Sequence, residues 1–332
     1  MNLRRLIKNE KGGMLVFAAA AAFGILACAA LSIDISYILT SQAELQNAVD
    51  AAALAGVTGL TKSQTEAVNR AAATAAKNVC ANRPVSINVA NITFPSATEI
   101  QVTAARSLSL YFGRVLGVAT KRINATATAS MQSLAGTDEV KPWAVPDFGW
   151  LPGQPVTLKP REIQETGHDD NDFYYADFPP INKGAPRDGI TEYKDNLKNG
   201  SDMTISIGDH VQIDNTCMPC VEYYTYNIIQ SLMRLDSRAF WNGSQVVNSN
   251  YPGNSSPRIF KIFLYNPNYP PTASAPVTSV TGLGAFFVES VSWDYQTNQF
   301  GYVTGRFIEI TTTGEAGDPT INSYLVGAKL VL

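Results

Sequence analysis

The longest apolar stretch of the chain lies near its N-terminus, where residues 12–33 carry no charged side chain. At about 1.5 Å of rise per residue, an α-helix over this stretch would be roughly 33 Å long, enough to cross a hydrocarbon core of about 30 Å. The pattern therefore predicts one membrane span. Residues 36–55 contain no Gly or Pro and are rich in Ala, Leu, Gln and Glu, so we expect the helix to continue beyond the membrane as a stalk.

The stalk carries an apolar stripe near the 3.6-residue helical period, formed by Ile38, Leu45, Ala48, Val49 and Ala52. Ala48 and Ala52 lie on one face of such a helix, and their small side chains allow a second helix to approach closely. We therefore predict that a helix of another protein packs against a face made of Leu45, Ala48, Val49 and Ala52.

Two carboxylates lie along the same helix. Asp34 falls where the span leaves the lipid, and Asp50 lies within a run of small residues. Either side chain can serve as a polar partner for a neighbouring helix. Because Asp is mostly found at protein surfaces, a solvated carboxylate is the default expectation at both positions.

Basic residues flank only one end of the span. Arg4, Arg5, Lys8 and Lys11 precede it, and the next basic residue is Lys62. Since the cytoplasmic flanks of membrane helices carry the excess of Lys and Arg, the N-terminus is predicted to be cytoplasmic and the rest of the chain to lie outside.

Residues 61–135 predict a small α+β domain. The expected elements are a helix at 64–81, a hairpin of strands at 85–94 and 99–105, a helix at 108–118 and a strand at 121–131. Their order predicts one sheet with helices on one side.

Residues 136–332 read mainly as β structure. Proline is frequent in residues 136–206, so we expect loops and short strands there. Beyond them the patterns predict a strand at 210–213, a helix at 221–238, and strands at 258–265, 283–293, 300–312 and 323–332. The predicted fold class is α+β: a transmembrane helix and stalk (1–60), a small α+β domain (61–135) and a mainly antiparallel β domain (136–332).

Composition narrows the functional classes. The net charge of −3 offers no basic surface for nucleic acid. The chain has two histidines, His168 and His210, and contains neither a nucleophile elbow, nor a Walker A loop, nor an HExxH helix. We therefore expect no enzyme activity and no cofactor. The acidic run 168–172 lacks the Gly and Glu positions of an EF-hand, which favours a solvated loop over a calcium site.

The N-terminal region resembles a known family. A basic tail followed by Glu10-Lys11-Gly12-Gly13, an apolar span ending in Ile33-Asp34 and the run QNAVDAAALA at 46–55 are similar to the anchor module of TadG-like proteins of bacterial Flp pilus assembly. The resemblance extends to about residue 131. It implies a non-enzymatic inner-membrane protein with a pilin-like small domain and a large periplasmic part. The implied partners are other pilin-like Tad/Flp assembly proteins and the inner-membrane pilus machinery.

Three C-terminal runs, at 256–259, 282–289 and 301–307, also resemble the C-terminal part of longer TadG-like proteins. Phe286 and Phe287, within the second run, are expected to pack in a strand rather than to bind a ligand.

Cys217 and Cys220 form the one motif with possible chemistry, a Cys-x-x-Cys at the start of a predicted helix. In an oxidising periplasm the expectation is a structural Cys217–Cys220 disulfide. The alternatives are a redox dithiol, a bond that involves Cys80, and a metal site.

Two kinds of processing compete with a permanent anchor. Pilin-type cleavage after Gly12 or Gly13 would leave no Glu at the fifth mature position, and the apolar run continues past the lipobox-like Cys28, so we expect neither. Two other functions remain open: a membrane-tethered extracytoplasmic binding or adhesion protein that shares only the anchor module, and a periplasmic thiol oxidoreductase that uses Cys217 and Cys220.

Overall fold

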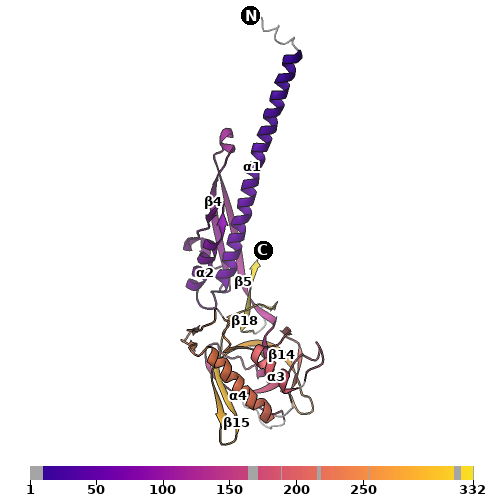
Figure 1. Ribbon diagram of the computed structural model, residues 1–332. Coiled ribbons are helices and arrows are strands. Elements are labelled where there is room, and N and C mark those ends of the chain that lie inside the picture. The colour runs from indigo at the N-terminus through magenta and orange to yellow at the C-terminus, as the bar shows by residue number, and fades with distance from the viewer. Residues whose placement is uncertain are drawn as a thin grey trace. The chain divides into compact units, whose positions relative to one another are not determined.

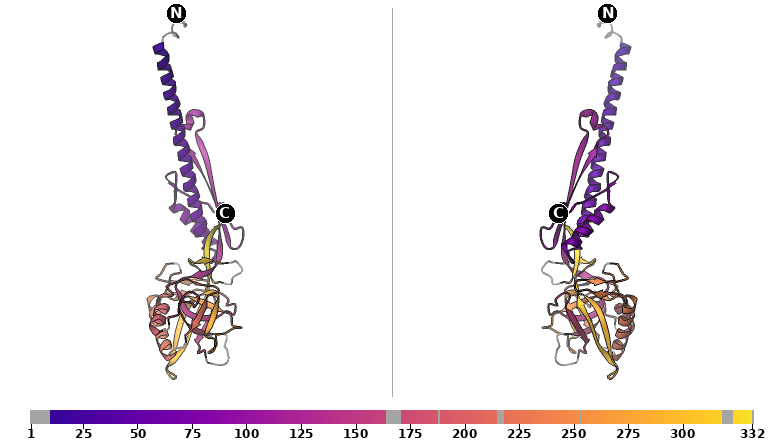
Figure 2. Two further views of the ribbon diagram at one scale, coloured as in Figure 1. Left: turned by 90° about the vertical axis from the view of Figure 1, so that its right-hand side faces the viewer. Right: turned by 90° about the vertical axis from the view of Figure 1, so that its left-hand side faces the viewer.

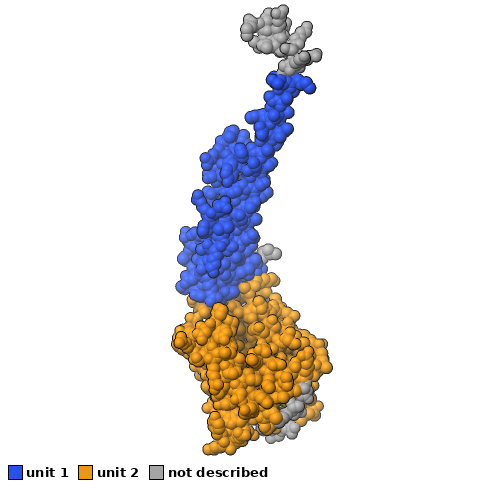
Figure 3. Space-filling view, in the orientation of Figure 1, with its two compact units in different colours: residues 1–60, 64–130, 330–332 blue, residues 61–63, 131–329 orange. Residues whose placement is uncertain are grey.

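The computed structural model describes residues 10–163, 171–187, 189–214, 218–252, 254–317 and 323–331. The chain forms two compact units, coloured separately in Figure 3. Unit 1 comprises residues 1–60, 64–130 and 330–332, and unit 2 comprises residues 61–63 and 131–329. The stalk and most of the small domain, which the sequence predicts as separate regions divided at residue 60, share one unit.

Unit 1 is built on one uninterrupted helix, α1 (Glu10–Val57), which joins the span to the stalk as expected (Figure 1). We call residues 14–33 the exposed half of α1 and residues 41–57 its buried half. Large apolar side chains of the exposed half face outward, whereas the buried half supplies Leu45, Val49 and Val57 to the core of unit 1.

Helix α2 (Gln64–Lys77) packs against the buried half of α1. Its buried face is made of Ala67, Ala71 and Ala75. Glycine lets the two helices approach: a Cβ on Gly59 would lie 2.6 Å from the Cα of Ala67, and one on Gly56 would lie 3.1 Å from the Cβ of Ala71.

A long hairpin, β4 (Glu99–Ser109) and the first part of β5 (Thr120–Thr137), runs beside α1 (Figure 2). The two strands pair antiparallel from Glu99↔Ser130 to Ser109↔Thr120. The other elements of unit 1 are short: β1 (Val79–Cys80), β2 (Arg83–Pro84), the 3-10 helix η2 (Val89–Asn91) and β3 (Ile92–Thr93), which pairs with β4.

Two predictions for this unit were wrong. Residues 108–118 do not form an α-helix: Leu108 and Leu110 continue the in-out alternation of β4, and Gly113 and Gly117 follow in a turn that holds only the 3-10 helix η3 (Gly113–Leu116). Gly117 has a φ of 81°, a conformation that favours glycine. The expected strand at 85–94 is reduced to β3.

Unit 2 contains a mixed, closed seven-stranded sheet in the order β10-β14-β13-β6-β8-β7-β15. The sheet closes because β14 also pairs with β15 and β10 also pairs with β8. Its strands are β6 (Val140–Pro146), β7 (Pro155–Pro160), β8 (Asp172–Asp177), β10 (His210–Ile213), β13 (Ile259–Tyr265), β14 (Val277–Asp294) and β15 (Gln299–Phe307).

The expected antiparallel C-terminal sheet is therefore only part of the pattern. The pairs β13–β6 and β7–β8 are parallel. In the first pair, β6 of the proline-rich stretch lies beside β13, which is far along the chain. Helices α3 (Ile190–Asn199) and α4 (Met218–Leu235) help build one hydrophobic core, with Trp143, Phe260 and Phe286. Alternate residues of the same strands, including Phe263 and Phe287, build a second core.

Shorter strands complete unit 2. β9 (Ile205–Ser206) and β17 (Glu315–Ala316) pair with the last part of β5, β16 (Ile310–Thr311) pairs with β18 (Leu325–Val331), and β11 (Phe240–Trp241) forms a hairpin with β12 (Val246–Val247).

Candidate functional site: the anchor helix and its hairpin

The exposed half of α1 leaves its apolar surface uncovered. Nine large side chains there are between 50% and 80% exposed: Met14, Leu15, Val16, Phe17, Phe23, Ile25, Leu26, Leu31 and Ile33. Water is an unfavourable environment for a continuous apolar cylinder of this kind, and a bilayer is a favourable one. By length and composition, the helix fits a single-pass membrane anchor.

The predicted helix-packing face lies in the buried half, and the same chain covers it. Leu45, Ala48, Val49 and Ala52 are at most 1% exposed. Helix α2 and strand β4 pack against this half of α1. The expectation that a second protein docks on this face is therefore corrected: the small alanines allow close approach, but the elements that approach are α2 and β4 of unit 1.

Asp34 has a role that its sequence position did not indicate. It is only 3% exposed, and its two carboxylate oxygens accept hydrogen bonds from three consecutive backbone N–H groups, those of Tyr111 (2.8 Å), Phe112 (2.9 Å) and Gly113 (2.6 Å). The Tyr37 and Tyr111 rings meet edge to face at 5.4 Å. The default expectation of a solvated carboxylate is wrong here, because Asp34 fastens the turn of the β4–β5 hairpin to α1.

Asp50 is half-buried and accepts a hydrogen bond of 2.7 Å from Gln46 Nε2 within α1. The same amide donates to the Thr126 oxygen at 3.1 Å, and Gln42 Nε2 donates to the Asn124 oxygen at 2.7 Å. Gln42 and Gln46 thus connect α1 to β5, a role that the sequence alone did not predict. Their spacing of four residues is the signal that places them on one face.

The cysteines do not gather into one site in the described chain. Cys28 is exposed on α1 and Cys80 is buried in unit 1, both as free thiols. Burial raises the pKa of the Cys80 thiol, so little thiolate forms there. Cys220 is disulfide-bonded at the start of α4, whereas Cys217 lies outside the described residues. The Cys217–Cys220 pairing stays a prediction. Most of the acidic run, residues 168–170, also lies outside the described residues.

The motif at 256–259 has a structural role in unit 2. Arg258 is buried, and its Nη1 donates to the backbone oxygens of Ala239 (2.7 Å) and Asp236 (3.1 Å). Its Nε donates to the Val288 oxygen at 3.0 Å, and Ser256 Oγ donates to Asp236 Oδ2 at 2.6 Å. These contacts join the end of α4 to β14.

The two glycine-containing runs are explained by close packing. A Cβ on Gly305 would lie 2.2 Å from the Phe287 oxygen and 2.6 Å from the Phe286 ring. A Cβ on Gly284 would lie 3.0 Å from the Phe307 ring. Phe286 and Phe287 are both fully buried, so they belong to the core.

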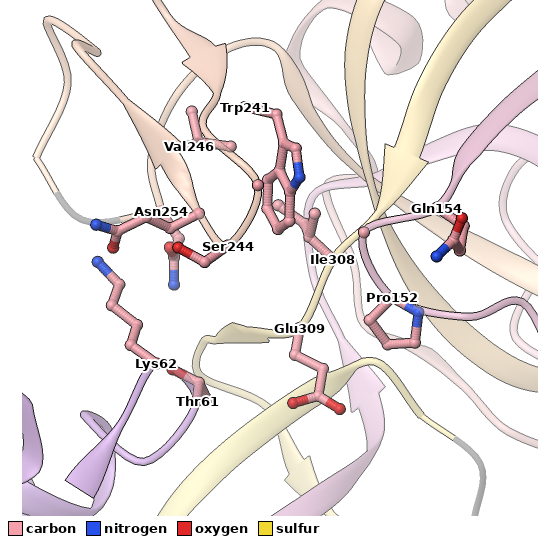
Figure 4. A pocket seen from close by; sticks show the side chains of 13 residues that line it. Thr61, Lys62, Pro152, Gln154, Trp241, Ser244, Val246, Asn254, Ile308 and Glu309 are labelled. Carbon is pink, nitrogen blue, oxygen red and sulfur yellow. The ribbon is translucent and has the colours of Figure 1, made fainter.

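Unit 2 has a cleft of about 360 Å³, shown in Figure 4. Trp241, Gln154 and Asn254 contribute to its wall, and its only ionisable lining side chains among the described residues are Lys62 and Glu309. Ser244 Oγ in this lining donates a hydrogen bond of 3.1 Å to Asn242 Oδ1, an amide oxygen that is not a general base.

A comparison with known protein families gives a match in the N-terminal part of the chain. Residues 12–76 match the family model described as putative Flp pilus-assembly TadE/G-like. Neither the curated proteins nor the solved structures contain a match to this chain. The matched segment covers both halves of α1 and nearly all of α2, which confirms the resemblance drawn from the sequence. Residues 12–76 of this chain are thus similar to the TadE/G-like family of Flp pilus assembly.

Proposed function

We propose that the protein is a non-enzymatic structural or assembly component of a bacterial Flp (Tad) type IVb pilus system. In this proposal the exposed half of α1 crosses the inner membrane once. The N-terminus is cytoplasmic, and the chain beyond α1 is periplasmic. The observation that carries the proposal is the family match over residues 12–76, the segment in which an uncovered apolar helix continues without a break into a packed core.

Charge supports the proposed orientation. The basic residues Arg4, Arg5, Lys8 and Lys11 lie on the N-terminal side of the exposed half, and the next one is Lys62. The positive-inside rule assigns the basic side to the cytoplasm.

The proposed partners are other pilin-like single-span proteins of the same apparatus and the inner-membrane pilus machinery. Unit 1 supports this view, because a long N-terminal helix packed on an antiparallel sheet leaves one apolar half free for contacts within the membrane. Those contacts would use side chains of the exposed half such as Phe23, Leu26 and Leu31, since the buried half is already covered.

Deletion of the gene tests the proposal. We expect the deletion strain to lack surface pili by electron microscopy and a plasmid copy of the full chain to restore them. Photo-crosslinking from Phe23 or Leu26 is expected to capture other single-span pilus proteins, with the buried Leu45 as the matched control position. Full piliation of the deletion strain would contradict the proposal and favour a tethered binding protein that shares only the anchor.

An insulin-reduction assay separates the proposal from a thiol oxidoreductase. We expect no activity from the purified chain. A rate that is present in the parent and lost in Cys220→Ser would assign redox chemistry to this cysteine instead.

A further inference from the structure

We propose that the turn of the β4–β5 hairpin, residues 110–119, inserts into the outer interface of the same bilayer that α1 crosses. This inference rests on the proposed membrane anchor and adds a second lipid contact to it. We call residues 110–119 the hairpin tip.

The hairpin tip is apolar where a turn in water is usually polar. Val115 is 85% exposed and Leu116 is 75% exposed, and Tyr111, Phe112 and Val118 are also exposed. The tip is nonetheless an ordered turn: the Leu110 N–H donates to the Ala119 oxygen at 3.0 Å, and the Val118 N–H donates to the Gly113 oxygen at 2.9 Å. A compact turn that displays neighbouring apolar side chains is suited to an apolar environment.

Asp34 sets the level of the hairpin tip along α1. Its carboxylate holds the N–H groups of Tyr111, Phe112 and Gly113, and it directly follows the charge-free residues 12–33. The tip is therefore fastened at the point where the helix leaves the hydrocarbon. Figures 1 and 2 show the hairpin beside α1, with its turn directed toward the N-terminal end of the helix.

The apolar surface of α1 continues past this level. Ile33, Ile35 and Leu39 are exposed on α1 close to Asp34 in sequence, so exposed apolar side chains occur on the helix on both sides of the residue that holds the tip. The helix and the tip both belong to unit 1, and Asp34 joins them by direct hydrogen bonds.

Charge around the tip suits lipid headgroups. Arg114 lies in the tip, and Lys121 and Arg122 follow it at the start of β5; all three are exposed. Residues 107–122 contain no Asp or Glu. Long basic side chains can bury their alkyl stems in an apolar environment and place their charge at headgroup level. Tyr111 is the residue type enriched at membrane interfaces.

Quenching by brominated lipids tests the inference with the full chain in nanodiscs. Three variants are compared with the parent, so that the native tryptophans are subtracted: Val115→Trp in the tip, Leu26→Trp in the span and Val89→Trp as the matched control. Val89 is also an exposed valine in a 3-10 helix of unit 1, but it lies in η2, away from the tip. Because all three side chains are exposed, the larger ring fits without displacing the core.

We expect lipids brominated along the acyl chain to quench the added fluorescence of Val115→Trp and Leu26→Trp, and to leave that of Val89→Trp unchanged. If Leu26→Trp is quenched while Val115→Trp behaves like Val89→Trp, the anchor stands and the tip inference is overturned. A blue-shifted but unquenched Val115→Trp would show that protein and not lipid covers the tip, which also overturns the inference. If Leu26→Trp itself is unquenched, the proposed anchor fails.

Discussion

The two halves of α1 belong to one unbroken, alanine-rich helix, yet they have opposite surroundings. In the exposed half, Phe17 and Leu26 point away from the protein, whereas in the buried half Leu45 and Val49 are enclosed by α2 and β4. Both halves are rich in small residues, but the exposed half has no charged side chain, whereas the buried half contains Glu44 and Asp50. The buried half also has a neighbour that packs closely on it: the alanine face of α2 approaches α1 near Gly56. The first half thus fits a membrane anchor, whereas the second half is part of the core of unit 1.

Truncation of one leucine in each half should give the largest difference in the stability of unit 1. Leu45→Ala removes a side chain that is 1% exposed, so we expect unit 1 to lose about 2–5 kcal/mol of unfolding free energy. Leu26→Ala removes a side chain that the protein does not cover, and unit 1 should keep its stability. Hydrogen exchange of the β4 amides in detergent measures the difference. Equal effects in the two variants would mean that the halves are not distinct.

Replacement of one alanine in each half by a larger residue should give a smaller difference in stability. Ala52→Phe forces a ring into a fully buried position between packed elements, with an expected loss of about 1–3 kcal/mol. The exposed Ala22→Phe has space for the ring and should leave thermal unfolding unchanged. A folded Ala52→Phe variant with parental melting temperature would show that α2 does not cover this face, and would restore the earlier expectation of a partner helix.

Asp34→Asn, between the two halves, should weaken only the local hydrogen bonds that hold the hairpin tip. The amide keeps one oxygen as an acceptor, but its NH2 group cannot accept from the backbone N–H groups that face it. We expect faster hydrogen exchange at Tyr111, Phe112 and Gly113, with β4 still protected. Asp50→Asn is the control, because Asp50 receives its hydrogen bond from Gln46 within α1. No change at these three amides would contradict the assignment of Asp34 as the fastening residue.

The sequence predicted those elements whose signal is local. A charge-free run predicted the first part of the helix α1. The patterns at 210–213 and 221–238 matched β10 and α4 closely, because in-out alternation and helical period are properties of neighbouring residues. The prediction of a helix at 108–118 was wrong although Leu108, Tyr111, Phe112 and Val115 fit a helical period. Pairing of Leu108 and Ser109 with β5 and the positive φ of Gly117 determine the observed strand and turn.

The contacts of the candidate site could not be predicted from the sequence, because they join segments that lie far apart along the chain. The partners of Asp34 lie 77 to 79 residues away along the chain, and nothing near Asp34 in sequence indicates them. The predicted packing face, Leu45, Ala48, Val49 and Ala52, is buried. The predicted partner was wrong, because a stripe of small residues does not specify whether α2 or another protein covers it. The parallel pair of β6 with β13 is likewise a long-range feature.

Thiol labelling from one side of the membrane tests most directly whether α1 is an anchor on one half and a core on the other. Val89→Cys lies in unit 1 beyond the buried half, and Lys8→Cys lies before the exposed half. In intact spheroplasts, a membrane-impermeant maleimide should label Val89→Cys, and it should label Lys8→Cys only after the membrane is permeabilised. Labelling of Lys8→Cys in sealed spheroplasts, or recovery of the chain in the soluble fraction, would contradict the account.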